Sequence, residues 1–129
     1  MRISIKRAYE DASRTDGYRV LVDRIWPRGR SRQDLALSDW AKDIAPSDGL
    51  RKWFGHDPAR WQAFQDRYQQ ELASPGQPDR LHALLVNAGR GPLTLVYGAK
   101  DTEHNQAVVL RQVLLKMSEH QRRGMDPHA

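Results

Sequence analysis

The chain has 129 residues, which is long enough for one domain that buries a core without covalent staples. It contains no cysteine, and this excludes disulfides, thiolate metal sites and cysteine nucleophiles. The formal net charge is +5 at pH 7, which favours a nucleic acid, a nucleotide or a phosphorylated metabolite as partner, although many basic soluble proteins bind no anion.

The N-terminal residues alternate between apolar and polar side chains and lack the apolar run of a signal peptide. No later segment is apolar over a length sufficient to span a bilayer. We therefore expect a cytoplasmic protein with no membrane partner, and we assign it no cofactor.

The N-terminal part of the chain predicts two strands. Residues 3–8 alternate in polarity, and residues 18–25 form a second apolar run with Val20 and Val22 on one face. Pro27 cannot donate a further ladder hydrogen bond, so the chain is expected to leave the sheet just before it.

The middle of the chain predicts helices that cover the sheet. Ser38 is expected to cap a short helix that runs to about Ile44, and Ser47 is expected to cap the next one. Asp57 is a good N-cap, and Pro58 suits the first helical position after it. The expected helices cover residues 38–44, 47–54, 57–72 and 78–88.

The C-terminal part predicts a buried strand over residues 93–97 and a last helix from near Thr102 to Met117. Strands separated by helices are typical of an α/β domain with a largely parallel sheet. We therefore expect a single α/β domain over residues 1–117, followed by a polar, flexible tail over residues 118–129.

Two polar clusters follow predicted strands, at residues 23–29 and 97–105. Ligands of open α/β sheets tend to bind outside the carboxyl ends of the strands. If the second and third predicted strands are parallel, both clusters fall at that edge, and this coincidence is the main functional signal of the sequence.

The first cluster contains groups suited to an anion. Arg24 and Arg28 can clamp a phosphate or carboxylate through bidentate hydrogen bonds, and Arg51 can present its guanidinium to the same place. The alternative for Arg24 is a structural ion pair with Asp23. Trp26, at the strand exit, can stack on a base or sugar.

The second cluster offers Lys100 as an ammonium, Asp101 as a carboxylate and His104 as a general acid or base. A helix that starts at Thr102 would also direct free backbone N–H groups towards this place. The competing interpretation is that Asp101 or Thr102 only caps that helix. Ser47 lacks the motif that surrounds a nucleophilic serine, so we interpret it as a cap.

A metal site formed by Asp23, Asp101 and His104 matches no known ligand spacing, so we expect no metal. His56, next to Asp57 and Pro58, is interpreted as a residue that holds the turn between two helices.

Two specific strings stand out, Trp-Pro-Arg-Gly at residues 26–29 and Gly-His-Asp-Pro at residues 55–58. With these strings, the chain resembles the YeaO-like branch of the domain-of-unknown-function 488 (DUF488) family, and the resemblance extends from Tyr18 to Leu114. The matching positions are residues 20–29, Trp40, 45–47, 50–51, 53–58, Trp61, Phe64, Tyr68, 71–72, 95–97, 99–101, 104–105 and 107–110.

This resemblance implies a compact bacterial α/β domain of unknown activity. The wider family shares an Asp-Arg pair at a strand end with a nearby Pro-Arg, and a second strand followed by an acid and a histidine. Some members carry a cysteine near the second position, where this chain has none. The matching residues here are Asp23, Arg24, Pro27, Arg28, Lys100, Asp101 and His104.

The sequence supports one leading hypothesis and two alternatives. The leading one is a small enzyme, or an enzyme-like pocket, that binds a phosphate-bearing substrate such as a nucleotide or a nucleic-acid end. Asp23, Lys100, Asp101 and His104 would then supply proton transfer or charge stabilisation. The alternatives are a non-catalytic nucleic-acid-binding module that uses the arginine loop and the basic tail, and a protein-interaction domain.

Overall fold

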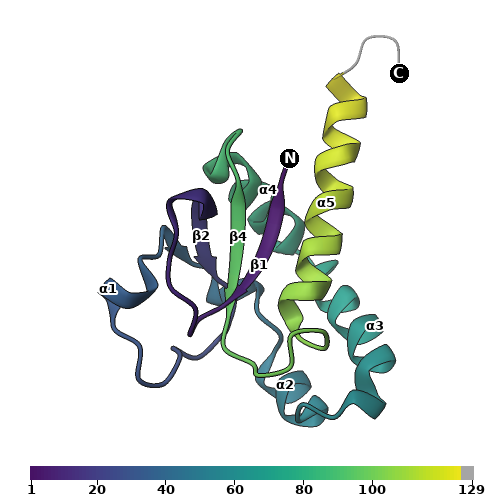
Figure 1. Ribbon diagram of the computed structural model, residues 1–129. Coiled ribbons are helices and arrows are strands. Elements are labelled where there is room, and N and C mark those ends of the chain that lie inside the picture. Colours follow the sequence, from purple (N-terminus) through teal and green to yellow (C-terminus); the bar gives the residue numbers. More distant parts are fainter. Residues whose placement is uncertain (126–129) are drawn as a thin grey trace.

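The computed structural model describes residues 1–125, which are organised around one sheet of parallel strands (Figure 1). The strand order is β1-β4-β2-β3. This sheet confirms the expected α/β fold. It also places β2 and β4 side by side and parallel, which is the condition for the two polar clusters to fall at one edge of the sheet. The strands are β1 (Ile3–Arg7), β2 (Tyr18–Leu21), β3 (Asp39–Trp40) and β4 (Leu93–Tyr97).

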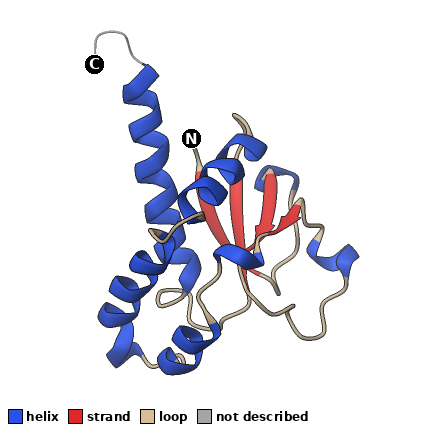
Figure 2. Ribbon diagram, turned by 180° about the vertical axis from the view of Figure 1, so that it is seen from behind, coloured by secondary structure: helices blue, strands red, loops and turns tan. Residues whose placement is uncertain are grey.

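The helices are distributed unequally over the two faces of the sheet. Figure 2 shows most of the helical residues gathered to one side of the strands, with one short helix, α1, apart from the others. The α-helices are α1 (Arg32–Leu35), α2 (Asp48–Phe54), α3 (Trp61–Leu72), α4 (Gln77–Ala88) and α5 (Gln106–Met125). Single 3-10 turns occupy Arg14–Asp16, Lys42–Ile44 and Pro58–Arg60.

The main hydrophobic core lies between the sheet and the helices α2 to α5. Val20 and Leu95 from the sheet are fully buried there together with Phe64, Tyr68 and Leu110 from the helices. The hydroxyl of Tyr68 donates a hydrogen bond of 2.6 Å to the carbonyl of Ile44, so its one polar atom is satisfied within the core.

A second, smaller core lies on the opposite face of the sheet. Leu21 and Val96 point to this side and pack against Leu35 of α1. Trp26 and Trp40 close the cluster, with ring centroids 5.4 Å apart in an edge-to-face arrangement. The alternation of side chains along a strand separates the two cores, because Val20 and Leu21 must face opposite sides.

The local helix signals in the middle of the chain are confirmed. Ser47 caps α2, since its Oγ accepts a hydrogen bond of 3.2 Å from the amide of Leu50 and donates one of 2.6 Å to Glu71. Gly55 ends the same helix in the left-handed conformation, with φ at 54°. Asp57 caps the turn that leads into α3.

The predicted helix over residues 38–44 is wrong in its first part, and only Lys42–Ile44 are helical, as a 3-10 turn. Residues 39 and 40 form β3, because the amide of Ser38 bonds to the carbonyl of Arg19 and the amide of Ala41 bonds to the carbonyl of Leu21. These contacts with β2 outweigh the local helix signal, and the hydroxyl of Ser38 accepts from Arg19 instead of capping a helix.

Two strand and helix ends also differ from expectation. The strand β2 ends at Leu21, four residues early, although the amide of Val22 still bonds to β4. The helix α5 starts at Gln106 and not near Thr102, because the side chain of Asn105 caps it by accepting from the amides of residues 107 and 108.

The predicted tail begins as helix. The helix α5 continues beyond residue 117 to Met125, which corrects the expected end of the last helix. Residues 126–129 lie outside the described residues, as do the side chains of Arg122 and Arg123. Within the described part, no helix combines the length and the apolar character needed to cross a bilayer.

Candidate functional site

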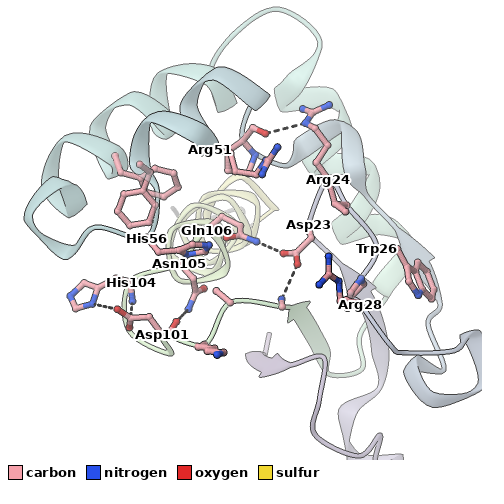
Figure 3. A pocket seen from close by; sticks show the side chains of 18 residues that line it. Asp23, Arg24, Trp26, Arg28, Arg51, His56, Asp101, His104, Asn105 and Gln106 are labelled. Atoms are coloured by element: carbon pink, nitrogen blue, oxygen red, sulfur yellow. Dashed lines mark hydrogen bonds and ion pairs between the residues drawn. The ribbon is translucent and has the colours of Figure 1, made fainter.

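A pocket of about 620 Å³ opens at the carboxyl edge of the sheet, where β2 and β4 end. Its 18 lining residues come from the segments that follow these two strands, from α2 and the residues on either side of it, from Phe64 of α3 and from Gln106 of α5 (Figure 3). All of the predicted site residues line it: Asp23, Arg24, Trp26, Arg28, Arg51, Lys100, Asp101 and His104.

The carboxylate of Asp23 connects the ends of three elements. Its Oδ2 accepts a hydrogen bond of 2.8 Å from the amide of Gly98, just after β4, and its Oδ1 accepts from the side chain of Gln106 at the start of α5. The carboxylate thereby accepts a hydrogen bond just beyond the last backbone hydrogen bond between the β2 segment and β4, which joins Val22 to Val96. Burial raises the pKa of Asp23 to about 6, while the bonds from Gly98 and Gln106 oppose that rise.

Arg24 does not pair with Asp23, so the structural ion pair considered from the sequence is absent. Its Nε donates to the carbonyl of Pro46 at 3.1 Å, and its Nη2 donates to the carbonyl of Ala45 at 3.3 Å. These bonds hold the segment before α2 against the segment after β2. Arg24 therefore shapes the wall of the pocket and keeps its positive charge there.

Two other cations of the pocket have no partner for their side chains among the described residues. Arg28 and Lys100 are exposed, and neither side chain makes a hydrogen bond or an ion pair there. Arg51 forms an exposed ion pair with Asp48 at 3.4 Å. Such a surface pair contributes little stability, so Arg51 can exchange Asp48 for another anion at low cost.

Trp26 lies at the edge of the pocket and belongs mainly to the second core. Its Nε1 donates to the carbonyl of Arg30 at 2.7 Å, and its ring packs edge-to-face on Trp40. Trp26 is thus fixed in place, and the stacking role that we predicted for it applies only to the part of the ring that lines the pocket.

Asp101 and His104 form a closed turn. Asp101 Oδ1 accepts from the amides of Glu103 and His104, and its Oδ2 lies 2.8 Å from Nδ1 of His104. The backbone bond from Glu103, followed by the bond from the His104 ring, lowers the pKa of Asp101. The ring of His104 also packs edge-to-face on Trp61, with centroids 5.2 Å apart. Asp101 is therefore a capping residue, as one of the two interpretations of the sequence proposed. It caps the turn that precedes α5, and not the helix itself.

The two carboxylates lie on different sides of the pocket. In Figure 3, Asp23 and Arg28 stand on one side, and Asp101 stands on the other with His104 beyond it. Among the described residues, no three His, Asp or Glu side chains gather in a group that could hold a metal ion. The predicted catalytic residues thus line one cavity from two sides.

Several lining residues were not predicted from the sequence. Gln106 contacts Asp23 across 83 residues of chain, and no local pattern marks that contact. Phe54 and Phe64 form an apolar wall with ring centroids 4.3 Å apart, and the helical periodicity marked them only as core residues. His56 lines the pocket with φ at 58°, directly after Gly55, which agrees with its expected place in the turn.

Known proteins resemble this chain over most of its length. It is 46% identical over 110 residues to the uncharacterized protein YeaO of Escherichia coli (strain K12), covering 85% of this chain and 94% of YeaO. It is 42% identical over 113 residues to the uncharacterized proteins Mb3100c of Mycobacterium bovis and Rv3073c of Mycobacterium tuberculosis, covering 88% of this chain and 93% of each relative. No solved structure matches it. A family model described as the inactive DUF488-N3 subclade matches residues 2–129, and the chain therefore belongs to that subclade of the DUF488 family.

Proposed function

We propose that this protein binds a small phosphate-bearing ligand, such as a nucleotide or a nucleic-acid end, in the pocket at the carboxyl edge of its sheet, and that it does so without catalysis. The observation that carries this proposal is the pair of lining cations, Arg28 and Lys100, whose side chains have no partner among the described residues. A phosphate would supply the missing acceptors.

The balance of charge in the pocket supports an anion. Four cationic side chains line it, against two carboxylates: Arg24, Arg28, Arg51 and Lys100 against Asp23 and Asp101. The cations thus outnumber the carboxylates, and a phosphate held by guanidinium groups forms strong, charge-assisted hydrogen bonds.

The apolar part of the lining supports a ligand that is larger than inorganic phosphate. Phe54, Phe64, Pro46 and Ile25 line the same cavity, and Ile25 is 58% exposed. A volume of about 620 Å³ lies in the range of ordinary small-molecule sites, which combine an apolar lining with a few polar groups. A nucleotide matches both features, because its flat base suits the apolar lining and its phosphate suits the cations.

Two features argue against a reaction. The matching subclade is described as inactive. In addition, His104 pairs with Asp101 through Nδ1 as a general base does, but no described residue that lines the pocket carries a hydroxyl or thiol for it to activate.

The test is a binding titration by calorimetry with inorganic phosphate, mononucleotides and short oligonucleotides at about 50 and 200 mM salt. Arg28→Ala and Lys100→Ala should each weaken mononucleotide binding by about tenfold or more, because each removes a charged hydrogen-bond donor. The matched controls are Arg90→Ala and Lys52→Ala, which remove exposed cations outside the pocket and should leave the affinity unchanged.

The outcomes separate the proposal from its alternatives. Equal losses in the pocket variants and in the controls would contradict a defined phosphate site. Binding of oligonucleotides alone, with an affinity that falls steeply between the two salt concentrations, would favour a non-catalytic nucleic-acid-binding module. Turnover of any of these ligands would contradict the non-catalytic role.

A further inference from the structure

The carboxylate of Asp23 is a partly buried group without a cationic partner. Four cations line the same pocket, yet no ion pair between any of them and Asp23 occurs among the described residues. Arg24, its neighbour in the chain, instead gives its hydrogen bonds to two backbone carbonyls. A carboxylate left in this state is costly unless further donors reach it.

The hydrogen-bonding capacity of Asp23 is only half used. A carboxylate has about four lone-pair positions on its two oxygens. Gly98 occupies one on Oδ2, and Gln106 occupies one on Oδ1. Each oxygen therefore keeps one further acceptor position, and Asp23 itself lines the cavity. The group is suited to two parallel donors, one for each oxygen.

The positive charge of the pocket limits which hydrogen-bond donors of a ligand can reach Asp23. A guanidinium or an alkylammonium group also offers several N–H donors, but the surrounding arginines and Lys100 would repel it. A neutral pair of adjacent N–H groups meets no such repulsion. Among the common nucleic-acid bases, guanine alone presents two adjacent donors, its ring N1–H and its exocyclic amino group.

The neighbouring apolar groups suit the flat body of such a base. Phe54 and Phe64 are stacked on each other and line the pocket, and Pro46 and Ile25 add apolar surface. Phe54 and Phe64 are only 5% and 2% exposed, so the apolar surface that a base can contact comes mainly from Ile25 and from the part of Trp26 that lines the pocket. The discrimination between bases would then come from Asp23.

We infer that the ligand of this pocket is a guanine nucleotide, whose N1–H and amino groups pair with the two oxygens of Asp23 while its phosphate is held by the lining cations. This inference rests on the proposed function and specifies its ligand. The raised pKa of Asp23 agrees with it, since burial without a counter-charge is what the paired donors would relieve on binding.

The experiment compares GMP, IMP, AMP and UMP by calorimetry at pH 7.5 and one salt concentration. GMP and IMP share their phosphate and sugar, and they differ only in the exocyclic amino group that we assign to Asp23. Wild-type protein should bind GMP about tenfold or more tightly than IMP, as expected for the loss of one hydrogen bond to a charged acceptor. Asp23→Asn should reduce that ratio to about two or less, and the surface control Asp79→Asn should preserve it.

The ratio of the GMP affinity to the IMP affinity is measured on the wild-type protein alone, so the inference stays testable even if Asp23→Asn folds poorly. Equal binding of GMP and IMP to the wild type would overturn the inference, and so would a preference for GMP that survives in Asp23→Asn. In both cases the proposed function would stand, provided that Arg28→Ala and Lys100→Ala still weaken nucleotide binding. Failure of the wild type to bind any nucleotide or phosphate would instead refute the proposed function itself.

Discussion

Burial of Asp23 makes this protein less stable as the pH rises through the acid range. The folded chain holds the Asp23 proton with a pKa of about 6, against 3.8 for a free carboxyl. Between these two values the folded state binds more protons than the unfolded state, so the free energy of unfolding falls with increasing pH. At about 1.4 kcal/mol for each unit of pKa, the stability lost above pH 6 is about 3 kcal/mol.

The substitution Asp23→Asn isolates this effect from all other titrations. Asparagine can still accept from Gly98 through its oxygen, and its amide group can donate to Gln106 once the Gln106 amide is turned over. The variant should therefore fold. We expect the unfolding free energy of wild type, relative to the variant, to fall by about 2 kcal/mol between pH 4 and pH 7.

The assay is urea denaturation followed by tryptophan fluorescence at several pH values, since the chain has four tryptophans. Asp79→Asn serves as the control, because it removes an exposed carboxylate on α4 and leaves Asp23 unchanged. A difference for Asp23→Asn that does not change with pH, or a relative stability of wild type that rises with pH, would refute the description of Asp23 as a partly buried carboxylate without a cationic partner.

Two further substitutions test the packing around the pocket and the core. Gly98→Ala should cost about 1–3 kcal/mol, because a Cβ there would lie 2.9 Å from Oδ2 of Asp23, whereas Gly91→Ala, with nothing within 4 Å, should cost little; thermal melts of both variants check this. Tyr68→Phe should cost about 1–3 kcal/mol in urea denaturation, because it leaves the buried carbonyl of Ile44 without its donor, and a cost near zero would mean that water replaces the hydroxyl.

Signals that depend on a few neighbouring residues predicted the helical part of the fold well. Ser47 and Gly55 bound α2 as expected, because a cap is formed by the residues next to it in the chain. The strand β3 could not be predicted in this way. Asp39 and Trp40 are extended only because β2 lies beside them, and that pairing is a tertiary contact.

In the candidate site, too, one part could be predicted from the sequence and another part could not. Its location followed from the sequence, because parallel strands bring their carboxyl ends to one edge, and the polar residues after β2 and β4 therefore meet. Its internal bonds did not follow. The guanidinium of Arg24 finds the carbonyls of Ala45 and Pro46, and Asp23 finds Gln106, through loop positions that no spacing in the sequence encodes.

The order of the strands has a consequence for how the chain is made. β4 lies between β1 and β2 and bonds to both, yet it is the last strand to be synthesised. Until residue 97 is available, β1 and β2 have no partner between them, and their inner edges stay open. A ribosome-bound chain that ends before β4 would therefore present exposed strand edges, and formation of the sheet must wait until β4 has been synthesised.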